Sequence, residues 1–271
     1  MLTETAAAKL NLALHVRRRR ADGQHEIETI FAFTAFGDSL QGEAADALTL
    51  AVTGEFGAAA GEGDDNLVLR AARALAAAAG ARAGAALRLN KCIPVAAGLG
   101  GGSADAAAAL RLLNRLWCLD WNEARLVEIA AGIGADVAAC VGSRTVFGRG
   151  RGETLTPLAN DWSGTPVLLV NPRVAVPTGP VFAGWNGVDR GALDPTVPLA
   201  RTRNDLAPPA LAIAPAIGDV LDWLARQPRV ILTRMSGSGA TCFALFDDDE
   251  SLARAAADVP SGWWSTATRL I

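Results

Sequence analysis

The amino-acid sequence predicts a protein of two domains that combines β-strands with α-helices. The chain has 271 residues, which is ample for two domains, and 51% of them are hydrophobic, so a sizeable core can form. Segments of alternating polarity, typical of strands, are interspersed with segments whose apolar residues recur at helical spacing. We place the domain boundary between Leu158 and Val167, which gives domains of residues 1–160 and 161–271.

Composition narrows the class of protein. The net charge of −3 argues against a general nucleic-acid binder. None of the four cysteines forms a Cys-x-x-Cys pair, so we expect neither a zinc site nor a disulfide framework. The first residues lack a basic segment followed by an apolar run, and no run of about 18 residues is free of charge, so we expect no signal peptide and no membrane span. These features favour a soluble, cytoplasmic protein.

Residues 9–16 alternate in character and predict a half-buried strand. Its polar face carries Lys9, Asn11 and His15, and this face either meets a ligand or is exposed to solvent. Lys9 and Lys91 are the only lysines among 25 basic residues, which suggests a chemical reason for a compact ammonium group at these positions.

A basic run, Arg17–Arg20, follows this strand and precedes a turn at Asp22-Gly23. Such a run is usually solvated, and the alternative is a role in attracting an anionic substrate. His25 lies just past the turn, either as a surface histidine or as a ring that reaches a ligand. Residues 27–36 then predict a strand that Asp38 closes.

The rest of the chain predicts further strands, helices and loops from the same patterns. The predicted helices share alanine-rich or amphipathic spacing, and two follow capping residues: residues 67–79 after Asp64-Asp65-Asn66, 123–131 after Trp121-Asn122, and 216–227. The predicted strands are short apolar or alternating runs: residues 48–52, 85–89, 167–170, 230–232 and 241–246, with a strand–turn–strand at 147–156. Glycine and proline mark loops at residues 54–63 and 187–198, and a short helix-like segment starts at Phe182 and Trp185.

The stretch from Pro94 to Ala109 contains four glycines between residues 98 and 102. Ser103 stands at a plausible N-cap, Asp105 lies where a first turn favours an acid, and a helix then runs to about Trp117. A glycine loop that opens a helix offers free N–H groups and a helix dipole to an anion, so we favour a phosphate site over an empty tight turn. The stretch lacks the lysine of a Walker A motif and has Ser103 where a dinucleotide fingerprint needs glycine.

Two later segments are further candidates for the site. Asp136 follows two glycines and precedes an apolar run, so it is either a helix cap or a functional carboxylate. Residues 235–240 (Met-Ser-Gly-Ser-Gly-Ala) form another glycine stretch, which caps a sheet edge or closes over a phosphate.

Residues 8–12, 94–105 and 235–240 together closely resemble the three motifs of the GHMP small-molecule kinases, which include galactokinase and the homoserine, mevalonate and phosphomevalonate kinases. The likeness covers nearly the whole chain and is closest to the branch whose acceptor is 4-diphosphocytidyl-2-C-methyl-D-erythritol, in the non-mevalonate isoprenoid pathway. The segments that indicate this branch are residues 8–12, 19–23 with His25-Glu26, 134–137, and 176–178 leading to Phe182.

The resemblance implies an α+β two-domain GHMP kinase fold with the active site in the inter-domain cleft, ATP and Mg²⁺ as cofactors, and a cytidine diphosphate-linked alcohol as substrate. It implies that Asp136 is the catalytic base and Lys9 the catalytic lysine. It places Asn66 near the adenine, Asn11 and Thr178 on the substrate, His25 on the cytosine edge and Phe182 stacked on the cytosine. The implied ATP phosphate loop consists of Pro94, Val95, Ala96, Ala97, Gly98, Leu99, Gly100, Gly101, Gly102, Ser103 and Ala104. Ser103 is also a candidate Mg²⁺ ligand.

The chain departs from the family pattern at three positions. Gln24 stands where the family usually has tyrosine, so one wall of the cytosine pocket is not accounted for by the resemblance. Ala104 replaces a common serine and Ala138 a common proline. Two alternatives remain: a GHMP kinase for another alcohol such as homoserine or mevalonate, and a non-catalytic nucleotide-binding protein on this fold. The presence of both Lys9 and Asp136 argues against the second.

Overall fold

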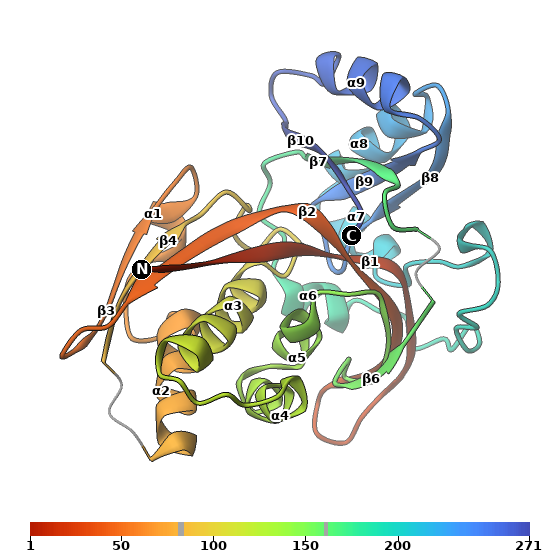
Figure 1. The fold of residues 1–271 in the computed structure, drawn as a ribbon. Helices are drawn as coiled ribbons and strands as arrows, with labels where there is room; N and C mark the ends of the chain where they lie inside the picture. The colour runs from red at the N-terminus through yellow and green to blue at the C-terminus, as the bar shows by residue number, and fades with distance from the viewer. Residues whose placement is uncertain (81–83, 160–161) are drawn as a thin grey trace. The chain divides into compact units, whose positions relative to one another are not determined.

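The computed structural model describes residues 1–80, 84–159 and 162–271, which form two compact units. Strands β1 (Leu2–Arg19) and β2 (His25–Glu43) each contribute to both units, so the units interleave along the chain (Figure 1). The first unit consists of Met1–Lys9, Gly37–Val95 and Gly100–Ser143, and the second of Leu10–Phe36, Ala96–Leu99 and Arg144–Ile271. The predicted division between residues 160 and 161 lies outside the described residues, and it stays a prediction.

Strand β1 differs from the half-buried strand that the sequence predicts. Its residues from Leu10 to Val16 are at most 3% exposed on either face. The polar face is covered because distant residues bond to it: Thr29 and Ser236 both contact Asn11. The alternative of a solvent-exposed polar face is therefore wrong. Strand β2 also runs further than predicted, and Asp38 is buried within it instead of closing it.

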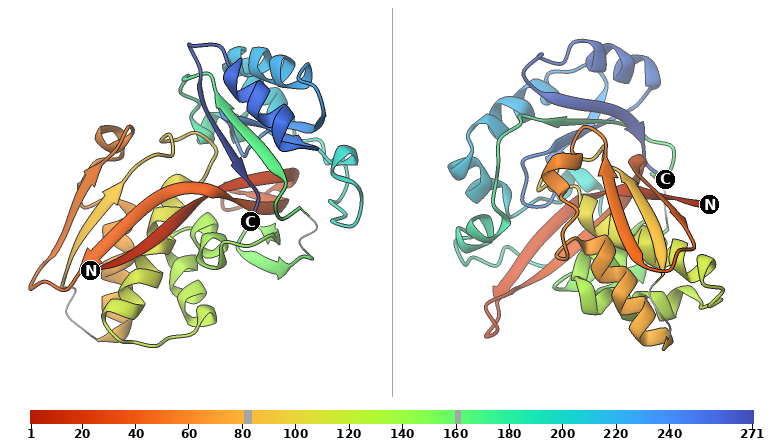
Figure 2. Two further views of the ribbon diagram at one scale, coloured as in Figure 1. Left: turned by 45° about the horizontal axis from the view of Figure 1, so that its top comes forward. Right: turned by 90° about the vertical axis from the view of Figure 1, so that its left-hand side faces the viewer.

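In the first unit, β4 (Ala85–Asn90) pairs antiparallel with the end of β2 and parallel with β3 (Leu48–Thr53). Helices α2 (Leu67–Ala79) and α3 (Gly101–Leu116) lie side by side next to these strands (Figure 2). Helix α2 has the predicted bounds because the Asn66 side chain accepts the Val68 N–H and Gly80 adopts a left-handed conformation at the other end. The unit also contains α1 (Gly57–Ala60), within a segment predicted as loop, α4 (Glu123–Ile133) and α5 (Ala135–Gly142).

In the second unit, a four-stranded sheet has the order β10-β7-β9-β8. Helices α8 and α9 pack on it through one hydrophobic cluster that joins Val220, Leu224 and Leu252 to Leu168 and Phe246. A strand pair, β5 with β6, continues from β2. The bounds are β5 (Val146–Gly150), β6 (Thr154–Pro157), β7 (Pro166–Asn171), β8 (Val230–Met235), β9 (Cys242–Phe246), β10 (Trp264–Arg269), α6 (Thr178–Ala183), η1 (Leu199–Arg201), α7 (Ala207–Ile213), α8 (Ala216–Ala225) and α9 (Asp249–Ala257).

Three predicted helix boundaries need correction here. Helix α4 ends at Ile133, two residues beyond the predicted Ala131. Phe182 lies near the end of α6, not at the start of a helix, because the chain enters this helix at Thr178 directly after Pro177. Helix α8 ends at Ala225, two residues before the predicted Gln227. In the part of the chain that the structure describes, none of the helices has the length and apolar character needed to cross a membrane.

Candidate active site

The glycine loop turns into α3 at Gly100, whose φ of 62° is left-handed. Gly100 is therefore the N-cap, and Ser103 is the third residue of the helix, so the prediction of Ser103 as N-cap is wrong. A side chain at residue 100 would be strained, and its Cβ would lie 2.9 Å from the Cε atom of Lys9. The loop thus approaches Lys9 closely, and the first N–H groups of α3 lack partners within the helix. The helix ends at Leu116, with Trp117 as C-cap, as predicted.

Residues 96–99 of the loop are held within the second unit by the last glycine stretch, residues 235–240, and by Thr241, which follows it. The Ser236 hydroxyl donates to the Gly98 carbonyl at 2.8 Å, and the Thr241 N–H donates to the Ala97 carbonyl at 3.1 Å. Gly98 has a φ of 78°, and a Cβ there would lie 2.2 Å from the Ser236 carbonyl oxygen. The last glycine stretch therefore supports the first loop directly, which residue spacing alone did not reveal.

Lys9 and Asp136 form an ion pair within the first unit, with Nζ and Oδ2 3.2 Å apart. The Lys9 side chain is 4% exposed, whereas the Asp136 side chain is 41% exposed. Asp136 is the second residue of α5, whose N-cap, Gly134, makes no side-chain capping bond. The helix-cap alternative is therefore not supported, and a partly accessible carboxylate lies beside a shielded ammonium group.

Asn11 is fixed within the second unit by two hydrogen bonds. Its backbone N–H donates to the Ser236 hydroxyl at 3.2 Å, and its side-chain amide donates to the Thr29 hydroxyl at 2.8 Å. Thr29 in turn donates to the Ala13 carbonyl. Ser236 thus links Asn11 to Gly98, a role that the sequence analysis missed because a buried serine beside a glycine carries no distinctive pattern.

His25 meets two aromatic rings from the segment after β7. Its ring centroid lies 5.1 Å from Phe182 and 5.9 Å from Trp185, the second in an edge-on arrangement. The Nε2 atom of His25 is buried without a hydrogen-bond partner. Burial first, and the nearby Arg19 charge second, lower the pKa of His25 below its usual value. At the start of α6, the Thr178 hydroxyl lies 3.0 Å from the Ser238 hydroxyl.

Lys91 lies in a buried cluster of charged side chains within the first unit. Lys91 forms buried ion pairs with Asp38 and with Asp105, the latter at 2.8 Å. This arrangement explains a lysine at position 91, and it shows that Asp105 belongs to a buried charge cluster and is not an acid that interacts with the helix dipole.

The Asn66 side chain caps α2 and also donates to the Gly61 carbonyl. Among the residues that the structure describes, no three His, Cys, Asp or Glu side chains form a group that could hold a metal ion.

Comparisons with known proteins agree with this arrangement. The model of the GHMP kinases N-terminal domain matches residues 66–144, and that of the GHMP kinases C-terminal domain matches residues 195–263. The 4-diphosphocytidyl-2-C-methyl-D-erythritol kinase of Rhizorhabdus wittichii is 56% identical and covers 99% of this chain and 94% of its own. The enzyme of that name from Novosphingobium aromaticivorans is 53% identical over 97% of this chain and 91% of its own.

A solved structure gives the same result. The crystal structure of a 4-(cytidine 5'-diphospho)-2C-methyl-D-erythritol kinase superposes with a TM-score of 0.85 at 34% identity and covers 99% of both chains. The likeness therefore extends over the whole chain in both sequence and fold. Since models of both domains match and close relatives span nearly every residue, this chain belongs to the GHMP kinase family, among the 4-diphosphocytidyl-2-C-methyl-D-erythritol kinases.

Proposed function

We propose that this protein transfers the γ-phosphoryl group of ATP to the 2-hydroxyl of 4-diphosphocytidyl-2-C-methyl-D-erythritol. The observation that carries this proposal is the ion pair between Lys9 and Asp136, next to the close approach of Gly100. Phosphoryl transfer depends on positioning and charge stabilisation more than on covalent chemistry by the protein. Here the accessible Asp136 carboxylate can position the acceptor hydroxyl. The buried Lys9 ammonium group and the glycine-capped start of α3 can stabilise the phosphate charge.

In this mechanism, Asp136 accepts the proton of the acceptor hydroxyl as its oxygen forms a bond to the γ-phosphorus. The bond between that phosphorus and the bridging oxygen breaks, and ADP leaves with the electron pair. Lys9 orients the Asp136 carboxylate and stabilises charge that develops on the transferred group. The N–H groups at the start of α3 donate to the phosphates.

Nucleotide and acceptor recognition use other residues. We assign the phosphate loop to residues 94–104, with Asn66 near the adenine. Asn11, held by Ser236 and Thr29, and Thr178 bind the acceptor. His25 and Phe182, whose rings lie close together, receive the cytosine: His25 meets its polar edge and Phe182 stacks on its face.

Mg²⁺ accompanies ATP in this proposal. Ser103, half-buried in the first turn of α3, offers the oxygen ligand that this hard cation prefers. When bound, the ion neutralises phosphate charge, and the nucleotide supplies most of its remaining ligands together with water.

The test is an ADP-release assay over a panel of alcohols. We expect release with 4-diphosphocytidyl-2-C-methyl-D-erythritol and background release with homoserine, mevalonate and the uncytidylated methylerythritol. Release with homoserine or mevalonate alone would favour the alternative of another GHMP kinase. ATP binding without release on any acceptor would favour a non-catalytic nucleotide-binding protein.

A further inference from the structure

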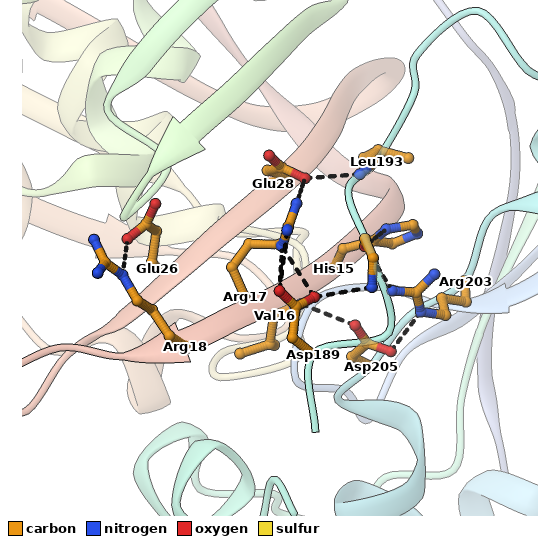
Figure 3. Close-up of polar contacts among 11 residues, drawn as sticks. His15, Val16, Arg17, Arg18, Glu26, Glu28, Asp189, Leu193, Arg203 and Asp205 are labelled. Carbon is orange, nitrogen blue, oxygen red and sulfur yellow. Dashed lines mark hydrogen bonds and ion pairs between the residues drawn. The ribbon is translucent and has the colours of Figure 1, made fainter. Parts of the chain in front are cut away.

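The four arginines at residues 17–20 make two kinds of contact. Three of its arginines form ion pairs with carboxylates: Arg17 with Glu28 and Asp189, Arg18 with Glu26, and Arg20 with Asp22 (Figure 3 shows the first two). Arg19 differs, because its guanidinium group donates to two backbone carbonyls, that of Ala183 at 2.8 Å and that of Trp185 at 2.7 Å. The run is therefore more than a solvated charge patch, and Arg19 has a structural target.

That target is the end of α6. The last carbonyl groups of a helix have no partners within the helix, and a cation beside them is favourable. Helix α6 has no basic residue in its own last turn, so Arg19 of β1 supplies the cation. At its other end, Thr178 contacts Ser238. This helix of six residues is thus tied at both ends, and Phe182 lies directly before one of the carbonyl groups that Arg19 binds.

The same guanidinium group acts on His25. Arg19 is the charged group that lowers the pKa of this histidine in addition to burial, while Phe182 and Trp185 contribute uncharged rings. A neutral imidazole keeps one nitrogen as a hydrogen-bond acceptor, whereas the protonated ring has none. Arg19 therefore favours the form of His25 that can accept a hydrogen bond.

We propose that Arg19 is a positioning residue for the acceptor: its hydrogen bonds to the Ala183 and Trp185 carbonyls hold the end of α6 so that Phe182 faces His25. This inference rests on the proposed function, which assigns the cytidine part of the acceptor to His25 and Phe182. Arg19 touches neither the reacting atoms nor the phosphate loop in this account. Its loss weakens acceptor binding and leaves ATP binding and the chemical step unchanged.

The experiment compares Arg19→Gln with Arg18→Gln. Both variants remove one positive charge from the same run, and the exposed Arg18 side chain pairs with the partly exposed Glu26 carboxylate. We expect Arg19→Gln to raise the KM for the cytidylated acceptor about tenfold, which is the change that about 1.4 kcal/mol produces. The ATP KM and kcat stay within about twofold, and Arg18→Gln changes all three by less than about twofold. Equal increases of the acceptor KM in both variants would show long-range charge attraction instead, and would overturn the proposal.

A pH series separates positioning from a general loss of structure. In the wild type, the acceptor KM rises as pH falls and His25 becomes protonated, and Arg19→Gln moves this rise to higher pH. Arg19→Lys retains the charge but not the paired hydrogen bonds, so it keeps the wild-type pH profile with an intermediate KM. An unchanged pH profile in Arg19→Gln would contradict the effect on His25. A wild-type enzyme with no activity on the cytidylated acceptor would instead refute the proposed function, which distinguishes the two failures.

Discussion

The ammonium group of Lys9 lies 3.2 Å from the carboxylate of Asp136, and only the carboxylate is substantially exposed. This difference in exposure suggests different roles for the two residues. The accessible oxygen atoms of Asp136 can meet an acceptor hydroxyl, while the buried lysine fixes their position. The close approach of Gly100 to the lysine stem brings the start of α3 to the same place.

The first prediction concerns Lys9. Lys9→Met should lower kcat about a hundredfold or more, because it removes the charge that faces the transferred group, and should change the ATP KM far less. Lys9→Arg should not restore kcat, because a planar guanidinium group differs in size and geometry from the compact ammonium group that pairs with Asp136. Steady-state kinetics of both variants test this, and turnover near wild type in Lys9→Met contradicts it.

The second prediction concerns the stack on the cytosine. Phe182→Ala should raise the acceptor KM about tenfold to a hundredfold, since stacking of a base on an aromatic ring contributes about 1–3 kcal/mol. The ATP KM measured on the same variant is the internal control and should stay unchanged. Similar increases of the two KM values would remove Phe182 from the cytosine site.

The third prediction concerns the phosphate loop. Gly98→Ala should destabilise the protein by about 1–3 kcal/mol and raise the ATP KM. The alanine backbone would be strained at the left-handed φ of this position, and its Cβ would collide with the Ser236 carbonyl oxygen. Gly132→Ala is the matched control: it lies in α4 with nothing within 4 Å of its added Cβ. Thermal unfolding and ATP titration of both variants give the comparison, and equal behaviour would contradict the role of Gly98.

The fourth prediction concerns pH and His15, whose Nδ1 contacts the Gly191 carbonyl (Figure 3 shows the surrounding charges). Burial and then Arg203 lower the pKa of His15, although Asp205 and Glu28 oppose this shift. The unfolded chain therefore takes up a proton first as pH falls below the ordinary value of 6.5, and stability is lost down to the folded pKa.

The corresponding variant is His15→Gln. Its melting temperature should fall less than that of the wild type between about pH 7.5 and pH 5, because one proton-binding group is removed from the unfolded chain. Differential scanning calorimetry at several pH values provides the measurement. Parallel falls in the two proteins would show that His15 does not contribute.

The sequence allowed many elements to be predicted because local signals mark them. Helix α2 has its predicted bounds since Asn66 caps it and Gly80 ends it. The sequence analysis assigns no helix to residues 207–213, which form α7; its first turn contains Pro208 and Pro209, and proline is well accommodated there. Alternation in β1 separated polar from apolar residues correctly but could not show that distant residues bury the polar face.

For the site, glycine patterns and the family resemblance supplied the named residues, but not the contacts that support them. The hydrogen bonds of Ser236 with Asn11 and Gly98 join residues that are far apart in the sequence, so no local sequence pattern predicts them. Arg19 was visible only as one of four adjacent arginines. Its partners, the carbonyls of Ala183 and Trp185, are backbone groups that a sequence motif does not reveal.

The most direct test of the account is Asp136→Asn, assayed with saturating ATP and 4-diphosphocytidyl-2-C-methyl-D-erythritol. The asparagine keeps the size of the side chain and cannot accept the proton, so kcat should fall about a thousandfold while ATP affinity stays within about twofold of wild type. ATP titration on the same preparation establishes that the loop is intact. Turnover near wild type in this variant would contradict the assignment of Asp136 as the base, and with it the mechanism proposed for this site.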